Sequence, residues 1–309
     1  MGPALEGRAE YLVIGGPTGV GKSAVALELA ERLNGEIVVA DSRQVYRGLE
    51  IGTAKPPADE RARVPHHLLD VVAIGERWTA GDFAVEAGAA IDAIRARGRV
   101  AVVCGGTGLY LAALAGALDP IEAGVVAGER EAARAKVGAI PPTQRFSALL
   151  RVDPVSADRL EEGDRQRVDR ALEVWFMTGE PLSALQVGAG EVRPHLAFRL
   201  ERDRAELVER IDRRLDAMLA AGLEDEARRL WEAGWSLEDP GLDTIGYREW
   251  WPAFAGERTR EEAIEAIRVV TRQYAKRQST WFRNQGAYRP VPAAQAVPAI
   301  VAAWRAVSG

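Results

Sequence analysis

Residues 16–23 read Gly-Pro-Thr-Gly-Val-Gly-Lys-Ser, and this octapeptide is the stretch that decides the fold. It matches the phosphate-loop pattern G-x-x-x-x-G-K-S/T. The apolar run at 11–14 predicts a strand before it, and residues 22–33 predict a helix behind it. A strand, a glycine turn and a helix N-terminus bring several backbone N–H groups together, and the helix dipole adds positive potential. The octapeptide therefore predicts a site for a polyphosphate or diphosphate, without identifying the molecule that carries it.

The composition is that of an ordinary globular protein. The chain has 309 residues, enough for one large or two modest domains, with 47% hydrophobic and 28% charged residues. We expect no signal peptide and no membrane span, because no apolar stretch has the required length and flanks. A single cysteine excludes an internal disulfide, which favours a cytoplasmic location. Together with only three histidines, it also argues against a structural zinc site.

Charge is unevenly distributed along the chain. The net charge of −5 does not indicate a nucleic-acid-binding protein, yet residues 266–309 contain seven Lys or Arg and no Asp or Glu. Arg268, Arg272 and Lys276 are spaced by four, so on a helix they form one basic stripe. The stripe is either a solvated helix face or a surface for an anionic partner. The missing acidic residues favour the partner.

Strand and helix patterns alternate in the first part of the chain. Strands are predicted at 11–14, 36–40 and 100–104, and helices near 22–33 and 82–97. This alternation predicts an α/β fold like that of P-loop NTPases, a parallel sheet with helices on both faces. Ligands of such sheets lie beyond the carboxyl ends of the strands, where the octapeptide, Asp41-Ser42 and the turn at 105–108 all fall.

The sequence changes character between 115 and 192, where strand-like runs end and Ala, Arg and Glu dominate. We expect this segment to be an all-helical domain inserted into a core formed by 1–114 and 193–309. A strand at 195–200 is expected to return to the sheet. Helices are expected at 204–220, 223–233, 260–283 and 298–307.

The chain carries a phosphate loop without most of the equipment of a nucleotide hydrolase. Such enzymes pair the loop with a strand-terminal acid for Mg²⁺, but the strand at 100–104 ends in Gly-Gly-Thr. Asp41, after the strand at 36–40, is the acid that ends a strand near the loop. No Asn-Lys-x-Asp element for guanine binding is present. This combination favours a transferase with an anionic leaving group.

Six further motifs follow the phosphate loop in order. They are DSRQVY at 41–46, IGTAKP at 51–56, HHLLD at 66–70, GGTGLY at 105–110, RALEV at 170–174 and AKRQSTWFR at 275–283. Together the seven motifs, spread over about residues 11–285, resemble those of the bacterial tRNA dimethylallyltransferases, also called tRNA isopentenyltransferases. Seven ordered motifs are far more specific than the loop by itself.

The resemblance implies a prenyl transfer. An enzyme of this family takes dimethylallyl diphosphate and attaches the dimethylallyl group to N6 of adenosine 37 in tRNAs that read codons beginning with U. The diphosphate would then be held by Gly16, Pro17, Thr18, Gly19, Val20, Gly21, Lys22 and Ser23. Mg²⁺ would bridge Ser23 and the diphosphate.

Three residues are the candidate catalytic groups. Asp41 is expected to orient the adenine amine and accept its proton, although it could instead ligate Mg²⁺ through water or cap a turn with Ser42. Thr18 and Arg214 are expected to stabilise negative charge on the departing diphosphate. In the helix predicted at 204–220, Arg214 lies at the shoulder of the apolar stripe. It can therefore reach across a groove or lie along its own helix.

The tRNA anticodon stem-loop is the expected macromolecular partner, because the target base must be extruded from its loop and held. The flipped base would meet Asp41–Gln44, the inserted domain would grip the stem, and the basic helix would hold phosphates. The residues expected to contact tRNA are Asp41, Ser42, Arg43, Gln44, Thr107, Gln166, Arg167, Val168, Asp169, Arg170, Tyr247, Arg248, Arg272, Lys276 and Arg277. We expect a monomer.

Two other functions are compatible with a phosphate loop. One is a small-molecule enzyme, either an adenylate isopentenyltransferase or a P-loop kinase, and the other is a non-enzymatic RNA-binding protein that uses ATP as a structural ligand. The acid-free C-terminal stretch and the inserted domain argue against the small-molecule enzymes. The likeness is weakest at 119–140 and at 160–163, where Leu-Glu-Glu-Gly replaces the family's Ile-His-Pro-Asn.

Overall fold

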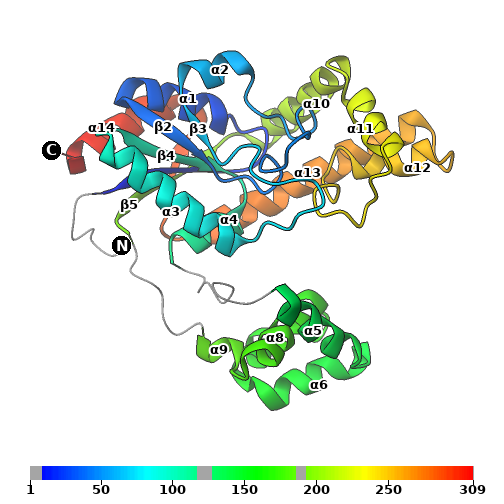
Figure 1. The fold of residues 1–309 in the computed structure, drawn as a ribbon. Helices are drawn as coiled ribbons and strands as arrows, with labels where there is room; N and C mark the ends of the chain where they lie inside the picture. The colour runs from blue at the N-terminus through cyan, green and yellow to red at the C-terminus, as the bar shows by residue number, and fades with distance from the viewer. Residues whose placement is uncertain (1–8, 117–126, 186–192, 309) are drawn as a thin grey trace. The chain divides into compact units, whose positions relative to one another are not determined.

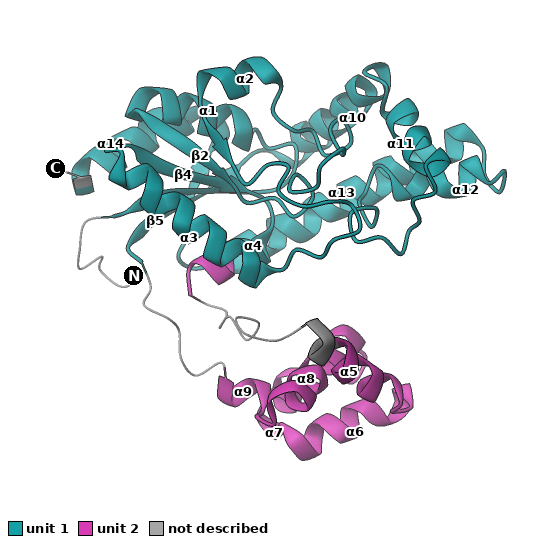
Figure 2. Ribbon diagram, in the orientation of Figure 1, with its two compact units in different colours: residues 1–111, 193–309 teal, residues 112–192 magenta. Residues whose placement is uncertain are grey.

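A computed structural model of the chain describes residues 9–116, 127–185 and 193–308. It contains two compact units, residues 1–111 with 193–309, and residues 112–192 (Figure 2). The first boundary lies at 111/112, where the sequence predicted 114/115, and the second at 192/193. No helix among the described residues has the length and apolar character that a membrane span requires.

The larger unit is built on six parallel strands in the order β3-β2-β4-β1-β5-β6 (Figure 1). The strands are β1 (Tyr11–Gly15), β2 (Gly35–Val39), β3 (His66–His67), β4 (Val100–Gly105), β5 (His195–Glu201) and β6 (Arg289–Pro292). The expected P-loop-like α/β fold is confirmed, and four of these strands lie where the sequence predicted them. The sequence missed β3 and β6. Both are short edge strands, one with two histidines and one with two prolines.

Helices cover both faces of the sheet, as predicted (Figure 1). They are α1 (Lys22–Leu33), α2 (Ala58–Arg63), α3 (Ala80–Ala96), α4 (Gly108–Leu114), α10 (Arg204–Ala220), α11 (Leu223–Glu232), α12 (Trp251–Phe254), α13 (Arg260–Asn284) and α14 (Ala296–Ser308), with 3-10 turns at Arg248–Trp250 and Ala293–Gln295. Leu12 and Ile14 join the apolar core that contains α1 and α14, because alternate residues of a strand point to one face.

A second apolar core lies beyond the carboxyl ends of the strands, between the segment at 45–51 and helices α10, α11 and α13. Its largest side chains include Tyr247 and Trp250, both with 0% of their surface exposed. Helix α13 begins at a capping box in which Thr259 and Glu262 satisfy each other's backbone N–H groups. This core fixes α10 and α13 beside the edge of the sheet where a ligand is expected.

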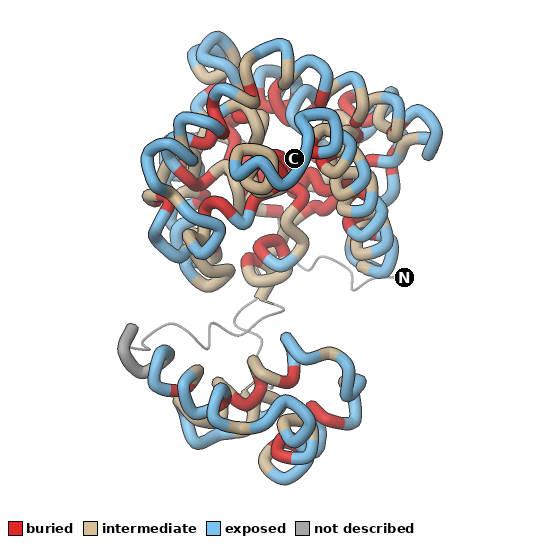
Figure 3. The backbone as a smooth tube through the Cα atoms, turned by 90° about the vertical axis from the view of Figure 1, so that its right-hand side faces the viewer, coloured by how far each residue is buried: buried red, intermediate tan, exposed pale blue. Residues whose placement is uncertain are grey.

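The smaller unit is all-helical, with α5 (Ala127–Gly138), α6 (Pro142–Val152), α7 (Pro154–Arg159), α8 (Arg165–Thr178) and α9 (Leu182–Leu185). It has a core of its own, which includes Leu149, Val168 and Leu172. Figure 3 shows buried residues gathered inside each unit, as expected for two separately packed domains. The Asp153 carboxylate accepts hydrogen bonds from Ser156 and Ser183 and so ties α7 to α9.

Candidate active site

The phosphate loop connects β1 to α1 through three glycines with positive φ, Gly16 at 144°, Gly19 at 80° and Gly21 at 107°. Side-chain-bearing residues rarely adopt these angles, so the glycines are required by the backbone path. Gly21 is the N-cap of α1, and no side chain caps this helix. The first N–H groups of α1 are therefore left for a ligand, and the helix dipole makes an anion the favoured one.

Lys22 adds a formal charge to this loop. Its Nζ donates a hydrogen bond to the Pro17 carbonyl at 2.9 Å. Burial lowers the pKa of the ammonium to about 8, while Asp41 acts to raise it and Arg214 to lower it further. An anion bound in the loop would favour the charged form of Lys22, because an adjacent negative charge offsets the cost of burial.

A cavity of about 340 Å³ lies against the phosphate loop at the carboxyl ends of β2 and β4. Helices α10 and α13 form its other side. The predicted site residues that line it are Thr18, Lys22, Ser23, Asp41, Ser42, Arg43, Gln44, Arg214, Arg248 and Arg277. Sequence positions more than 250 residues apart thus meet in one cavity, and its volume falls within the range of small-molecule sites.

Asp41 follows β2 and faces this cavity. Its Oδ1 accepts a hydrogen bond from the Arg43 N–H at 2.9 Å, so the carboxylate caps its own turn. Within the described residues, no hydrogen bond to Oδ2 is found. The neighbouring Ser42 N–H donates to Thr107 Oγ1 at 3.0 Å, which ties this turn to the end of β4. One oxygen of Asp41 is therefore positioned by the backbone while the other can meet a ligand.

Arg214 reaches across from α10 to the phosphate loop instead of lying along its own helix. Its Nη1 donates to Thr18 Oγ1 at 3.4 Å. Burial lowers the pKa of the guanidinium, and Asp41 acts in the opposite direction. One turn earlier on α10, Arg210 donates from Nε to the Gly19 carbonyl at 2.9 Å, a contact that the sequence analysis missed. The spacing of four between Arg210 and Arg214 is the signal that could have found it.

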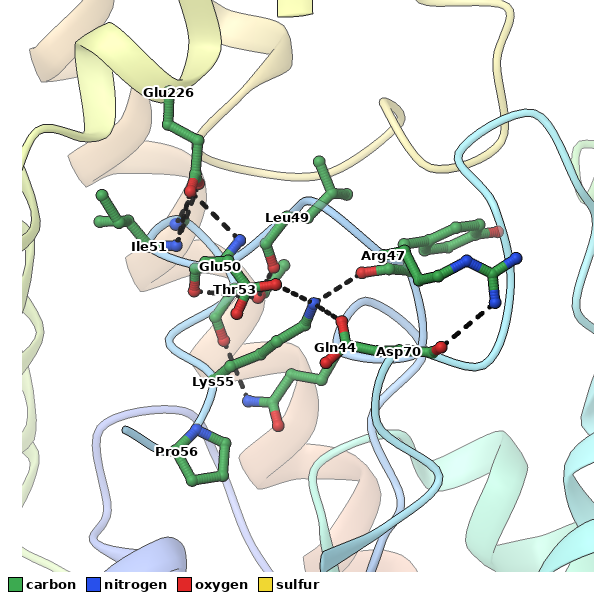
Figure 4. A network of polar contacts seen from close by, with 12 residues as sticks. Gln44, Arg47, Leu49, Glu50, Ile51, Thr53, Lys55, Pro56, Asp70 and Glu226 are labelled. Carbon is green, nitrogen blue, oxygen red and sulfur yellow. Dashed lines mark hydrogen bonds and ion pairs between the residues drawn. The ribbon is translucent and has the colours of Figure 1, made fainter. Parts of the chain in front are cut away.

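A network of polar contacts holds the segment that carries Asp41–Gln44 (Figure 4). The Gln44 amide nitrogen donates to the carbonyls of Thr53 at 3.0 Å and Ala54 at 3.2 Å, which fixes its orientation and leaves its oxygen for the cavity. Lys55, with 1% of its side chain exposed, donates to the Tyr46 carbonyl at 2.7 Å and to the carboxylates of Glu50 and Asp70.

Two predicted tRNA contacts are corrected by burial. Tyr247 is completely buried, and its hydroxyl accepts from the Gly52 N–H at 3.0 Å and donates to Glu226. Its side chain therefore supports the segment shown in Figure 4 and cannot face an RNA. Val168 is 2% exposed and belongs to the core of the smaller unit. The sequence analysis assigned both residues to the tRNA surface because each lies in a segment that was assigned there. In the structure, only neighbouring residues of those segments are accessible.

The basic stripe of α13 is partly neutralised, which corrects the expectation drawn from the acid-free stretch. Arg272 forms two hydrogen bonds with Asp212 of α10, at 3.0 and 2.6 Å, and Arg268 pairs with Asp216 at 2.6 Å. The compensating acids come from another helix, about 60 residues earlier in the chain. Lys276 and Arg277 are exposed, and within the described residues neither has an ion pair.

The remaining candidates differ in how accessible they are. Arg248 is paired with Asp243 at 2.8 Å and with Glu249 at 3.0 Å while still lining the cavity. In the smaller unit, Gln166 and Arg167 are exposed on the first turn of α8. Asp169 pairs with Arg145 at 2.6 Å, and Arg170 contacts Glu173 at 3.4 Å.

Comparisons with known proteins agree with this geometry. The family model described as IPP transferase matches residues 44–285, and one described as Isopentenyl transferase matches residues 9–75. The chain is 47% identical to tRNA dimethylallyltransferase 1 of Citrifermentans bemidjiense, over 91% of each sequence. It is 49% identical to tRNA dimethylallyltransferase of Halorhodospira halophila, over 90% of this chain and 91% of the relative.

Solved structures give the same result. The full-length tRNA isopentenylpyrophosphate transferase of Bacillus halodurans is 35% identical, with a TM-score of 0.70 and coverage of 97% of this chain and 98% of that one. A eukaryotic dimethylallyltransferase acting on tRNA is 30% identical, with a TM-score of 0.80 and coverage of 92% of this chain and 73% of that one. The chain therefore belongs to the tRNA dimethylallyltransferase family.

Proposed function

We propose that this enzyme transfers the dimethylallyl group of dimethylallyl diphosphate to N6 of adenosine 37 in tRNAs that read codons beginning with U, and releases diphosphate. The observation that carries the proposal is that the phosphate loop, Arg214 and the Asp41 carboxylate face one cavity. An anionic leaving group and a weakly nucleophilic amine need these two kinds of residue side by side. Family membership supports the reaction class.

The diphosphate of the donor would occupy the phosphate loop. As the bond between the allylic carbon and oxygen breaks, negative charge grows on that oxygen, and fixed donors lower the barrier. The candidate donors are the loop N–H groups, Lys22 and the pair formed by Thr18 and Arg214. Removing one such donor typically lowers kcat by about 10²–10³-fold.

Mg²⁺ fits the residues present at the loop. Ser23 and Asp41 line the same cavity, and both supply the oxygen ligands that this cation prefers. Among the described residues no group of three or more His, Cys, Asp or Glu could hold a metal, so the diphosphate would complete the coordination. We propose that Ser23 holds Mg²⁺ together with the diphosphate and that the ion neutralises part of its charge when bound.

The acceptor is the exocyclic amine of adenine, whose lone pair is delocalised into the ring. The amine must lose a proton as the new carbon–nitrogen bond forms, and Asp41 would accept that proton. Such proton transfer typically contributes about 10²–10⁴-fold to the rate. The base must first leave the anticodon loop, at a cost of about a few kcal/mol that contacts with Asp41–Gln44 would offset.

The backbone of the anticodon stem-loop would be held by exposed cations. These are Lys276 and Arg277 on α13, Arg277 beside the cavity, and Arg167 on α8 of the smaller unit, where the neutral Gln166 could add a hydrogen bond. Exclusion of water would protect the allylic centre from hydrolysis. We place this reaction in the cytoplasm and propose that a monomer carries it out.

A labelled-donor assay tests the proposal. Purified enzyme would be incubated with radiolabelled dimethylallyl diphosphate and either unmodified tRNA or AMP, ADP and ATP. We expect label on adenosine 37 of the tRNA, and a tRNA with guanosine at position 37 is the matched control. Label on free nucleotides without label on tRNA would identify an adenylate isopentenyltransferase instead, and nucleotide binding with no transfer would refute the proposal.

A further inference from the structure

Gln278 of α13 bonds to both sides of the cavity through one buried side chain, 8% exposed. Its Oε1 accepts a hydrogen bond from the Thr18 N–H at 2.8 Å, and its Nε2 donates to the Gly106 carbonyl at 2.9 Å. A backbone N–H only donates and a carbonyl only accepts, so the amide has one possible orientation. Both bonds span most of the chain, with sequence separations of 260 and 172 residues.

The two backbone segments that Gln278 joins belong to different halves of the proposed site. Thr18 lies in the phosphate loop, and its hydroxyl accepts from Arg214 at 3.4 Å. Gly106 is followed by Thr107, whose Oγ1 accepts from the Ser42 N–H beside Asp41. One amide therefore connects the segment that would hold the diphosphate with the segment that positions the carboxylate.

The space around Gly106 shows that the fold depends on a close contact between the Gln278 amide and this glycine. A Cβ atom at position 106 would lie 2.4 Å from Gln278 Nε2, far closer than two heavy atoms can come. A residue with a side chain there would displace the amide. The φ of Gly106 lies outside the left-handed region, so its backbone conformation does not require glycine. The close contact with Gln278 is the reason that a glycine is needed there.

We infer that Gln278 is a positioning residue, which sets the distance between the diphosphate cradle and the turn that carries Asp41. It acts through backbone groups and not by contact with the reacting atoms. The inference rests on the proposed function. Lys276 and Arg277 precede it directly, so the same turn of α13 that would meet RNA phosphates also holds the phosphate loop.

The test compares Gln278→Met, which has a similar length and no hydrogen-bonding group, with Gln278→Glu, which can still accept from the Thr18 N–H but cannot donate to the Gly106 carbonyl. Gln273→Met is the control, because Gln273 is exposed on the same helix. For each protein we would measure kcat, KM for dimethylallyl diphosphate, the affinity for an anticodon stem-loop without donor, and the thermal midpoint.

For Gln278→Met we expect kcat to fall by about 10- to 100-fold, because two groups lose their partners in a site that must be ordered. Stem-loop affinity should stay within about twofold, since exposed cations supply phosphate contacts. Gln278→Glu should also lower kcat, because its carboxylate cannot donate to the Gly106 carbonyl.

An unchanged kcat in a folded Gln278→Met protein would overturn the inference, as would a parallel loss of kcat and stem-loop affinity in both Gln278 variants. If Gln278→Met does not fold, Gln278→Glu decides by the same criteria. If the wild type and Gln273→Met label no tRNA, the proposed function fails, and that outcome is distinct from a defect confined to the Gln278 variants.

Discussion

The segment formed by residues 44–56, shown in Figure 4, allows a quantitative prediction, because the Lys55 ammonium bonds to several of its groups. Replacing Lys55 by Met removes the donor to the Tyr46 carbonyl and the partner of two carboxylates. Leaving a buried charge without its partner typically costs about 3–5 kcal/mol. Glu50 and Asp70 have 47% and 31% of their side chains exposed and each retains Arg61 nearby, so they recover much of this by hydration.

The carbonyl of Tyr46 recovers less. It loses its donor at a buried position, which typically costs about 1–3 kcal/mol. The two carboxylates add a smaller cost, because they regain hydration and keep Arg61 nearby. Taking both costs together, we expect Lys55→Met to lower the free energy of unfolding by about 3 kcal/mol. Because the same segment fixes the Gln44 amide, kcat should fall more than the affinity for the diphosphate donor does.

The assay is urea unfolding followed by tryptophan fluorescence. The adjoining core contains several tryptophans, namely Trp78, Trp235, Trp250 and Trp251. Arg61→Met is the matched control, since its pairs are more exposed and should contribute less than about 1 kcal/mol. A Lys55→Met protein within about 1 kcal/mol of the wild type, with an unchanged slope, would refute the view that this ammonium holds the segment.

Three further predictions concern the cavity. The pKa of Lys22 is lowered to about 8, so the ammonium is charged below that pH and neutral above it. The affinity for inorganic diphosphate, measured by calorimetry, should therefore fall by up to about tenfold per pH unit above 8. Lys22→Met should abolish that dependence. Asp41→Asn should lower single-turnover rates by about 10²–10⁴-fold while stem-loop affinity is largely retained, and an unchanged rate would exclude Asp41 as the base. Arg272→Gln should leave the salt dependence of tRNA binding nearly unchanged because its guanidinium is paired with α10, whereas Lys276→Gln with Arg277→Gln should flatten it by about two phosphate contacts; equal slopes in the two variants would contradict this assignment.

The central part of the fold could be predicted because its signals are local. An apolar run followed by the glycine loop and an amphipathic helix defines β1, the phosphate loop and α1 within 23 residues, 11–33. The two edge strands could not be predicted in the same way. His66–His67 and Arg289–Pro292 carry no strand pattern, and they become strands only because a neighbouring strand offers hydrogen-bonding groups.

The site shows the same division between local and distant information. The residue types identified the phosphate loop and Asp41, but they could not show which cations are paired with a carboxylate. Arg272 looked available until α10 placed Asp212 against it, and Tyr247 looked accessible until its hydroxyl met Glu226. Gln278 lies in the motif at 275–283, but the sequence analysis assigned it no role, because an amide acquires one only when the fold brings two backbone segments to it.

The charges of the cavity explain how a phosphate loop can serve alkyl transfer. Lys22, Arg214 and Asp41 line this cavity, and in the proposed reaction the two cations would face the leaving group while Asp41 would face the amine that releases a proton. Both cations are half-buried, and this burial lowers the pKa of each, so their fields are screened less than in solution. Because Thr18 and Gly106 are bonded to one amide, a shift of the loop relative to the end of β4 must break one of these hydrogen bonds, and the Ser42–Thr107 bond ties the Asp41 turn to the same strand. The spacing of the two charged sides is therefore held by packing before either substrate arrives, which is the condition under which fixed charges lower a barrier most.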